Sequence, residues 1–388
     1  MKILYFSPHP QLNLNSPAGY GSHMRGTINA LIELGHDVKC FIAGGTEKEL
    51  KQAKNSYVTK LIKKCVPSWL KETIKDYQLL KLDKIQGQRL MELMKEYQPD
   101  LVYERGYYLM TAGVKTSRNF GVKHMLEVNA PFIQEKIEMG GFSIYLKTAE
   151  RIEKYKAQNT DSLVVVSTAL KQHMVKNYTV DPKKILVCPN GINTQDWLPD
   201  LTKVNDLRSR YKYKNTDFVV GFVGSILPHH GVDELIHAFH QVAKMNWKLL
   251  IVGDGWPLNE LKKQVEKLNI GNQVIFTGNV PFAEVKNYMS LFNVGVMPKS
   301  NWYGSPVKIF EYGAMGIPVI APNNGPVRDV MNEGEDGYLI FDSNELADAL
   351  KQINTNLYEA MNKAKSWQKK VLFNYTWIAN TTLTLSHH

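Results

Sequence analysis

Residues 293–321 read NVGVMPKSNWYGSPVKIFEYGAMGIPVIA. The order of apolar and turn-forming residues predicts a strand, a loop, a helix and a second strand. Val294–Met297 is an apolar run of strand length, Pro298–Gly304 forms the loop, and Ile317–Ala321 is the next buried strand. This stretch is therefore one unit of an alternating α/β fold.

The helix of this stretch has signals at both ends and two charges on one face. Ser305 is expected to cap it with Pro306 in the first turn, and Gly316 is expected to end it. A helix N-terminus beside a glycine loop attracts anions. Lys308 and Glu311 lie three residues apart, on nearly the same face. Both an anion site and a solvated Lys–Glu pair remain open at this point.

Length and composition set the class of protein. A chain of 388 residues suggests two or three domains. The net charge of +10 favours acidic partners such as phosphates, anionic lipid or nucleic acid. Three widely spaced cysteines indicate a reducing compartment. We expect no leader, because Met1 begins a strand-like run and not a charged-then-apolar segment, and no apolar stretch reaches the ~18 residues that span a bilayer. We therefore expect a cytoplasmic protein.

The first half opens like a doubly wound α/β domain. Strands at Ile3–Phe6 and Val38–Ile42 flank a loop and a helix. The loop carries Gly19, Tyr20 and Gly21, at the carboxyl end of a strand where ligands bind in such sheets. The glycine spacing does not match the dinucleotide fingerprint. A ligand contact and a purely conformational need for glycine both explain this loop.

Residues 47–98 form a lysine-rich insertion with helical periodicity, which Pro67 is expected to break into two short helices. A basic amphipathic segment carrying a Trp suits an anionic membrane surface. Packing of its apolar face on its own domain is the alternative.

Lys123–Val128 is a strand that delivers polar groups at its carboxyl end. Glu127 lies within it, and Asn129 follows it. Asn129 could bond a ligand hydroxyl or cap the helix that begins after Pro131. The sequence leaves both open.

The strand–helix pattern restarts after a polar stretch at 193–217, where we place the interdomain linker. In the second half the strands end in glycine-bearing turns at 224–231, 253–255 and 278–280. Parallel strands end at one edge, so these turns gather backbone amides suited to a diphosphate.

The fold class is therefore two doubly wound Rossmann-like domains facing across a cleft. We expect an N-terminal domain at 1–195 with the insertion, a C-terminal domain at 206–365, and a helix at 366–388 crossing back to the first domain.

Taken together, these residues resemble glycosyltransferase family 4, whose members have the two-domain GT-B fold. The likeness covers nearly the whole chain, and it rests on the order and spacing of short segments. The matching segments are Phe222–Ser225 with His230 and Gly231, Ile251–Gly255, Phe276–Val280, Gly304–Pro318, Ser16–Gly21, Gly35–Val38 and Pro189–Gly191.

The resemblance implies a nucleotide-sugar site. The family has two glutamates separated by seven residues, and Glu311 matches the second, which binds the ribose hydroxyls. Gly253, Asn279 and Val280 are the implied nucleoside contacts. The implied contacts of the diphosphate and sugar are Gly21, Gly224, Ser225, His229, His230, Gly304, Ser305, Pro306, Val307 and Lys308.

This chain departs from the family pattern at the positions nearest the chemistry. Tyr303 stands where the first glutamate is expected. The family's histidine at the end of a first-domain strand is replaced by Glu127-Val128-Asn129. Asn129 is our substitute candidate, and we take Glu127 and Tyr303 as further catalytic candidates.

The basic residues of the family's first loop are also replaced. His229 and His230 stand where a basic pair is usual, and Ser225 replaces the usual arginine. We expect Lys308 to supply the missing charge. If a protonated His230 binds phosphate, donor affinity should fall as the pH rises past the ~6.5 of an unperturbed imidazole.

The resemblance implies a retaining, metal-independent glycosyltransferase without a cofactor. The donor would be a nucleoside diphosphate sugar, with UDP favoured over GDP. The acceptor would be a glycan, a lipid-linked or a small molecule, bound near Gly19 and Tyr20, in the synthesis of cell-surface polysaccharide or glycoconjugate.

Two other classes of function remain open. One is a nucleotide-sugar epimerase of the same fold, and the other is a non-catalytic sugar-nucleotide or glycan-binding protein. Nucleic acid is not an expected partner, because the basic residues are not interleaved with aromatic ones. We expect a cytoplasmic location, with the cytoplasmic face of the membrane as the alternative.

Overall fold

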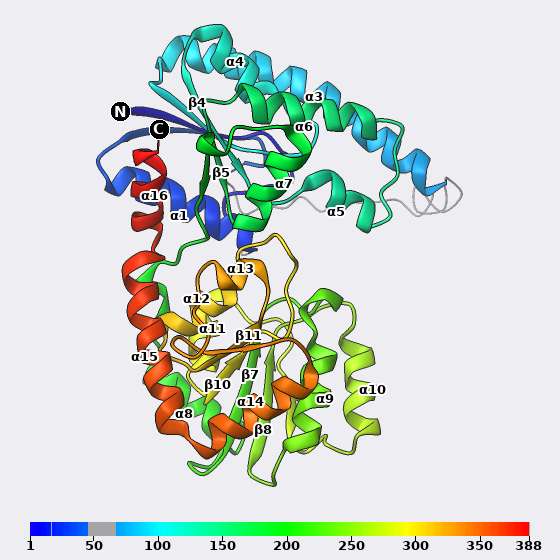
Figure 1. Ribbon diagram of the computed structural model, residues 1–388, viewed down its shortest axis with the longest axis vertical. Coiled ribbons are helices and arrows are strands. Elements are labelled where there is room, and N and C mark those ends of the chain that lie inside the picture. The colour runs from blue at the N-terminus through cyan, green and yellow to red at the C-terminus, as the bar shows by residue number, and fades with distance from the viewer. Residues whose placement is uncertain (17, 46–66, 388) are drawn as a thin grey trace. The chain divides into compact units, whose positions relative to one another are not determined.

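The computed structural model describes residues 1–16, 18–45 and 67–387 (Figure 1). The chain divides into two compact units, each built around a six-stranded parallel sheet. The N-terminal unit comprises Met1–Cys188 and Thr381–His388, and the C-terminal unit comprises Pro189–Asn380. The prediction of two Rossmann-like α/β domains is confirmed.

The N-terminal sheet has the order β2-β1-β3-β4-β5-β6. The chain moves outward from β1 to β2 and then returns to the other side of β1, so the order reverses between β1 and β3. The strands are β1 Lys2–Ser7, β2 Asp37–Ile42, β3 Leu101–Arg105, β4 Lys123–Val128, β5 Ser162–Val165 and β6 Ile185–Val187. The helices are α1 Gly19–Glu33, α3 Ser68–Tyr97, α4 Ala112–Phe120, α5 Phe132–Glu138, α6 Leu146–Asn159, α7 Thr168–Tyr178 and the short 3-10 helix η1 Pro182–Lys184.

Strand β1 shows why this sheet is buried on both faces. Ile3 and Tyr5 pack into the cluster that contains the apolar stripe of α1. Leu4 and Phe6 point the other way, into the cluster formed with α3 and α4. Alternate side chains of a strand face opposite sides. A strand covered by helices on both faces therefore needs a continuous apolar run.

The C-terminal sheet has the order β12-β11-β10-β7-β8-β9. The strands are β7 Phe218–Val223, β8 Trp247–Val252, β9 Val274–Phe276, β10 Val294–Val296, β11 Val319–Pro322 and β12 Tyr338–Ile340. The helices are α8 Leu201–Arg210, α9 Val232–Val242, α10 Leu258–Lys267, α11 Phe282–Met289, α12 Val307–Ala314, α13 Gly325–Arg328, α14 Ser343–Thr355 and α15 Leu357–Asn374, with the 3-10 helices η2 Thr194–Trp197 and η3 Pro228–His230. The last helix, α16 Trp377–Ser386, begins in this unit and passes into the N-terminal unit at Thr381.

The segment expected to be a linker is part of the C-terminal unit instead. It contains η2 and α8, and Trp197, Val204 and Leu207 are buried in the core of that unit. Polar residues dominate the segment, and only these few apolar side chains attach it to the core. The unit begins at Pro189 and not at residue 206.

The C-terminal helices also differ from expectation. Residues 366–388 do not form one helix. Trp367 lies on α15 and is fully buried in the C-terminal unit, while only Thr381–His388 group with the N-terminal unit. Leu385 then packs against the α1 side of the N-terminal sheet.

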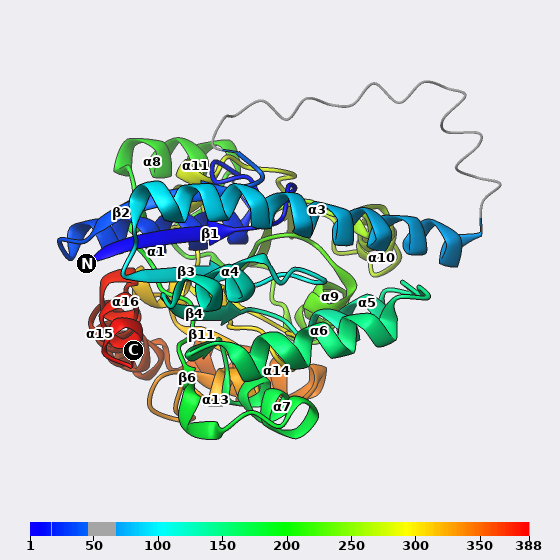
Figure 2. The ribbon, with the colours of Figure 1, turned by 90° about the horizontal axis from the view of Figure 1, so that it is seen from above.

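The insertion contains one long helix after Pro67 rather than a short one. Helix α3 spans 30 residues and extends past the sheet that its C-terminal half covers (Figures 1 and 2). The first of the two predicted helices falls at residues 46–66, outside the described residues. The long helix expected after Pro131 is divided into α5 and α6.

Candidate active site

Three turns at the carboxyl ends of β7, β8 and β9 are in backbone contact. Gly253 has φ +143°, and a Cβ there would lie 2.0 Å from the carbonyl oxygen of Gly224. A Cβ on Gly255 would lie 1.8 Å from the carbonyl oxygen of Ile226. Gly253 also pairs with Gly278 of the next turn. Only glycine permits such close approach. The predicted gathering of these turns is therefore present.

Lys308 reaches from the first turn of α12 to the Gly224 turn. A Cβ on Gly224 would lie 2.7 Å from Cε of Lys308. The Lys308 Nζ lies 5.5 Å from the centre of the Phe222 ring and 3.5 Å from Nε2 of His230. The fold thus brings Lys308 next to a loop that lies more than 70 residues earlier in the sequence, and its role at a diphosphate stays a prediction.

His230 is held as a neutral imidazole. Its Nδ1–H donates to the carbonyl oxygen of Ser225 at 2.6 Å, which leaves Nε2 as an acceptor facing Lys308. Burial, followed by the charge of Lys308, lowers the pKa of His230 to about 4. Both observations disfavour the imidazolium in the protein without ligand, and phosphate binding by His230 stays a prediction. The ring of His229 packs edge-on against His230, 4.4 Å between centres.

Glu311 shares this half-buried environment with Lys308. Burial raises the pKa of Glu311, and the positive charge of Lys308 opposes that rise. Burial likewise lowers the pKa of Lys308. Within the described part of the chain the Glu311 carboxylate has no hydrogen-bond or ion-pair partner. An acid carried in this state is unfavourable for folding, which is typical of a binding site.

The start of α12 differs from the prediction. Ser305 does not cap the helix; its Oγ accepts a hydrogen bond from the amide of Asn190 at 2.9 Å. Pro306 occupies the N-cap position, and Val307 donates to the carbonyl oxygen of Ser305. The amide of Gly304 is bonded to Asn301 at 2.6 Å. The predicted end of the helix is confirmed, because Gly316 follows its last turn with φ +66°.

Helix α12 is fixed from its other faces. The hydroxyl of Tyr312 accepts from the amide of Val223 and donates to the carbonyl oxygen of Val296, which ties the helix to β7 and β10. The indole N–H of Trp367 donates to the carbonyl oxygen of Ile309 at 2.7 Å. Lys308 and Glu311 are therefore presented by a rigid element.

Tyr303 lies in the loop before α12 and is 7% exposed. Its ring packs edge-on against Trp302, 5.3 Å between centres. The position at which the resemblance implies an acid thus holds a buried ring that also packs the loop. Of the residues implied to contact the nucleoside, Asn279 is exposed and Val280 is half-buried against the core of the C-terminal unit.

In the N-terminal unit, Glu127 is a buried carboxylate surrounded by donors. Oε1 accepts from Arg105 at 2.8 Å and from Asn129, and Oε2 contacts Tyr103 at 2.9 Å and Nε2 of His23 at 3.0 Å. Burial raises the pKa of Glu127, but His23 and Arg105 outweigh it and hold the pKa well below its usual range. Glu127 is therefore held as a carboxylate by four neighbouring donors, which makes it a weak base, and its catalytic role stays a prediction.

Asn129 does not cap the following helix. Helix α5 begins after Pro131 without a side-chain cap, and the Asn129 amide donates to Glu127 instead. The capping alternative is wrong. The open alternative, a ligand contact, remains a prediction.

The glycine loop of the N-terminal unit is the first turn of α1. A Cβ on Gly21 would lie 2.2 Å from the carbonyl oxygen of Ser16, so glycine is required for packing. Gly19 has open space around it, and the Tyr20 hydroxyl donates to the carbonyl oxygen of Gln11 at 3.3 Å. The conformational explanation accounts for Gly21.

Sequence reasoning missed one polar residue of this unit. His9 follows β1, is 5% exposed, and stacks on Tyr107 with 3.8 Å between ring centres. Burial lowers the pKa of His9 to about 4. The only signal was a histidine between two prolines directly after a strand.

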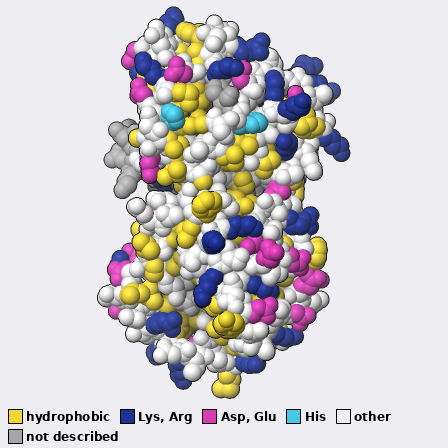
Figure 3. Space-filling model, turned by 60° about the vertical axis from the view of Figure 1, so that its left-hand side comes forward, with side chains coloured by type: hydrophobic (Ala, Val, Ile, Leu, Met, Phe, Trp, Pro, Cys, Tyr) yellow, Lys and Arg dark blue, Asp and Glu magenta, His cyan; other side chains and the backbone are white. Residues whose placement is uncertain are grey.

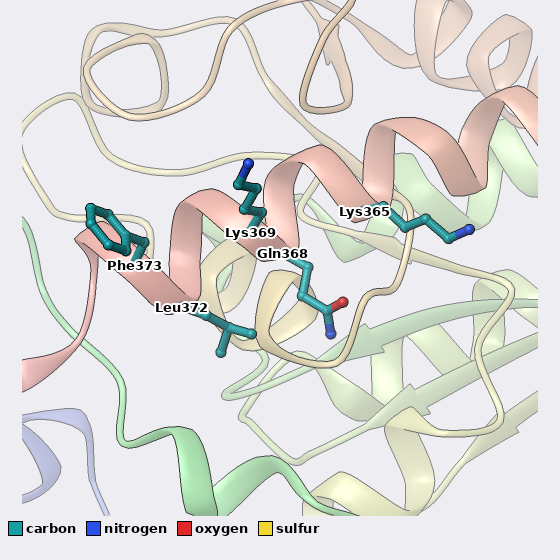
Figure 4. A pocket seen from close by; sticks show the side chains of 5 residues that line it. All are labelled: Lys365, Gln368, Lys369, Leu372 and Phe373. Carbon is teal, nitrogen blue, oxygen red and sulfur yellow. The ribbon is translucent and has the colours of Figure 1, made fainter.

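The shallow pocket of Figure 4 lies elsewhere, on the outer side of α15. Its lining residues are Lys365, Gln368, Lys369, Leu372 and Phe373. Gln368 is used structurally, since it donates to the carbonyl oxygen of Ala314 at 2.9 Å. On the face shown in Figure 3, Lys and Arg side chains are dispersed over both units and do not form one basic patch. None of the helices in the described ranges is both long and apolar enough for a membrane span.

Comparisons with known proteins cover both units. The family model described as Glycosyltransferase Family 4 matches residues 17–196, and the one described as Glycosyl transferases group 1 matches residues 204–370. HepE from Anabaena, solved in complex with UDP, superposes with a TM-score of 0.75 at 18% identity, covering 100% of this chain and 99% of HepE. That likeness supports the GT-B fold.

Two curated relatives have named activities. The chain is 28% identical over 258 residues to the Escherichia coli UDP-Gal:alpha-D-GlcNAc-diphosphoundecaprenol alpha-1,3-galactosyltransferase, covering 65% of each protein. It is 27% identical over 200 residues to the Mycobacterium tuberculosis GDP-mannose-dependent alpha-(1-6)-phosphatidylinositol monomannoside mannosyltransferase, covering 49% of this chain and 51% of that enzyme. The chain thus spans between half and two thirds of these relatives.

The two matches are separated by residues 197–203, shortly after the unit boundary at Pro189, and each lies almost wholly within one unit. On this evidence the chain belongs to glycosyltransferase family 4.

Proposed function

We propose that the protein transfers a sugar from a nucleoside diphosphate sugar to a hydroxyl-bearing acceptor. The observation that carries this is the unpartnered Glu311 carboxylate beside Lys308, at the edge where the turns of β7, β8 and β9 meet. A carboxylate accepts hydrogen bonds from a pair of ribose hydroxyls, and an ammonium group binds phosphate.

Each residue of the donor site would have one role. Glu311 would bind the ribose, and Lys308 would stabilise the diphosphate as the glycosidic bond breaks. His230 would hold Lys308 through Nε2, and the Gly304–Val307 segment would contact the sugar side. Fixed charges and dipoles at a developing anion are an effective source of catalysis. In this proposal the reaction retains the anomeric configuration and needs neither metal nor cofactor.

UDP is the favoured nucleotide, and GDP is the second choice. The E. coli relative is named for UDP-Gal, HepE was solved with UDP, and the mycobacterial relative is named for GDP-mannose. The sugar itself remains open, since Tyr303 replaces the acid that the family places beside it.

The acceptor would be a glycan or lipid-linked sugar in the synthesis of surface polysaccharide or glycoconjugate. Both named relatives act on lipid-linked acceptors according to their names. The N-terminal half of α3 exposes Trp69, Ile74 and Tyr77, and the nearby segment around Phe142 and Ile144 is also exposed and apolar. This surface would place the protein on the cytoplasmic face of an anionic membrane.

A flotation assay with liposomes tests the membrane part. The wild-type protein should float with vesicles containing phosphatidylglycerol, and a Trp69→Ser, Phe142→Ser double variant should not. Equal flotation of both proteins would reject this surface.

The central test is a screen of purified protein against common nucleotide sugars, with slow donor hydrolysis followed by mass spectrometry. Release of free sugar and nucleoside diphosphate is expected for one donor. NMR of the product then reports whether its anomeric configuration is retained. An epimerised nucleotide sugar would instead favour the epimerase alternative, and absence of turnover for all donors would favour a binding protein.

A further inference from the structure

Three aromatic rings follow three neighbouring strands of the N-terminal sheet. His9 comes after β1, Tyr107 after β3, and Phe132 begins the helix after β4. The ring centres of His9 and Tyr107 are 3.8 Å apart, and those of Tyr107 and Phe132 are 5.4 Å apart. The carboxyl ends of β1, β3 and β4 therefore share one continuous aromatic row.

This row lies where a doubly wound sheet binds its ligands. The strand order β2-β1-β3-β4 reverses direction between β1 and β3. The crevice outside the carboxyl ends of strands at such a reversal is the usual ligand site. His9 and Tyr107 follow the two strands that flank it.

The imidazole of His9 has a defined tautomer. The amide of Gln11 donates to Nδ1 at 3.2 Å, so in the neutral ring the proton is on Nε2. Burial keeps the ring neutral, because it lowers the pKa of His9 to about 4. Among the described residues no hydrogen bond from Nε2–H is found, and this nitrogen is not one of the fully buried polar atoms without a partner. Nε2–H is therefore open to water or to a ligand hydroxyl.

The charges around the row are already used. Lys156 is fully buried and donates to the carbonyl oxygen of Tyr107 at 2.7 Å and to Glu153 at 2.8 Å. Glu127 is matched by Arg105 and His23. No cation of the described part is left here for a phosphate. Aromatic surface with one neutral donor suits an uncharged ligand that has both apolar faces and hydroxyls.

We propose that His9, Tyr107 and Phe132 bind a pyranose ring of the acceptor, with the aromatic row against its C–H face and His9 Nε2–H donating to a ring hydroxyl. The inference rests on the proposed transferase function and narrows the acceptor to a carbohydrate. It makes His9 a residue that positions the acceptor and leaves the donor site unchanged.

The test uses the full-length protein with 15N-labelled histidine. Methyl pyranosides of glucose, galactose, mannose and N-acetylglucosamine are titrated with and without UDP, and inorganic phosphate is titrated separately. The His9 ring signal, assigned with a His9→Asn variant, should shift saturably with at least one pyranoside. The His36→Gln variant is the control, and the remaining histidine signals report folding.

Loss of one neutral hydrogen bond should weaken pyranoside binding by about threefold to tenfold in His9→Asn, followed by calorimetry. Tyr107→Leu should weaken it as well, and UDP affinity should stay unchanged in both variants. A His9 signal that responds to phosphate but to no pyranoside would overturn the inference, as would no response at all.

These experiments distinguish failure of the proposed pyranose site from failure of the proposed transferase activity. If the wild-type protein hydrolyses a nucleotide sugar while no pyranoside reaches His9, the acceptor site is wrong and the transferase proposal stands. If a pyranoside shifts His9 but no nucleotide sugar binds or reacts, the carbohydrate site stands and the transferase proposal fails.

Discussion

Glu311→Gln separates binding from folding more cleanly than any other change in the donor site. The substitution keeps the size of the side chain and removes its charge. Hydrogen bonds to a charged group contribute ~1.5–3 kcal/mol. Donor affinity should therefore fall about 10- to 150-fold if the carboxylate binds the ribose hydroxyls.

The fold should not suffer from this change. Burial raises the pKa of Glu311 above its unfolded value, so ionisation of Glu311 costs stability as the pH rises through that folded pKa. Glutamine avoids this cost, while the attraction between Glu311 and Lys308 is lost. The two effects oppose each other, and we expect a Tm at pH 8 within a few degrees of wild type.

Calorimetric titration with UDP and with the reactive nucleotide sugar measures the affinity, and thermal unfolding monitored by circular dichroism measures the Tm. Glu260→Gln, an exposed acid on α10, is the matched control. Unchanged nucleotide affinity in a folded Glu311→Gln protein would refute the role of Glu311. A large drop in Tm would show that the carboxylate is structural.

Three further predictions follow from the same unit. Lys308→Met should weaken UDP binding about tenfold or more while uridine binding changes little, because the ammonium group acts on phosphate; equal losses in calorimetry would contradict this. Gly253→Ala should lower the free energy of unfolding in urea by ~1–3 kcal/mol, because its φ is +143° and a Cβ would meet the Gly224 carbonyl oxygen, whereas Gly271→Ala, with open space around it, should not. The folded pKa of His230 lies near 4 and the unfolded value near ~6.5. As the pH is lowered through that window, the unfolded chain takes up the proton before the folded protein does, so the free energy of unfolding should fall. It should fall less steeply with pH in His230→Gln. Equal slopes for the two proteins would show that His230 does not titrate in this way.

Strands that are bounded apolar runs could be predicted almost to the residue. Lys123–Val128 and Phe218–Val223 have the predicted limits. Each is covered on both faces, so all of its residues except Lys123 are buried, and a glycine or polar residue follows its end. The glycine turns of the C-terminal sheet could be predicted for a related reason, since close backbone contact at Gly253 and Gly255 and positive φ at Gly224 and Gly278 favour glycine there.

Features that depend on distant partners could not be predicted. Ser305 has the local pattern of a helix cap, yet Asn190, 115 residues away in sequence, uses its hydroxyl. Glu127 had the position of a catalytic acid, and only the fold shows the donors that saturate it. His9 carried no periodic signal, because its neighbour Tyr107 comes from another strand.

The way the chain enters and leaves the C-terminal unit has a consequence for exchanging parts between relatives. The side chain of Asn380 donates to the carbonyl oxygen of Pro189 at 2.6 Å, and Ile192 pairs with Thr376. The C-terminal unit thus lies in sequence between two parts of the N-terminal unit, and hydrogen bonds hold its first and last residues together. A chimera joined only before Pro189 would import a foreign tail in place of Thr381–His388, and Leu385 would be lost from the host core. A chimera with junctions both before Pro189 and before Thr381 should keep the N-terminal unit of the host intact. We expect it to take its donor preference from the relative that supplies the C-terminal unit.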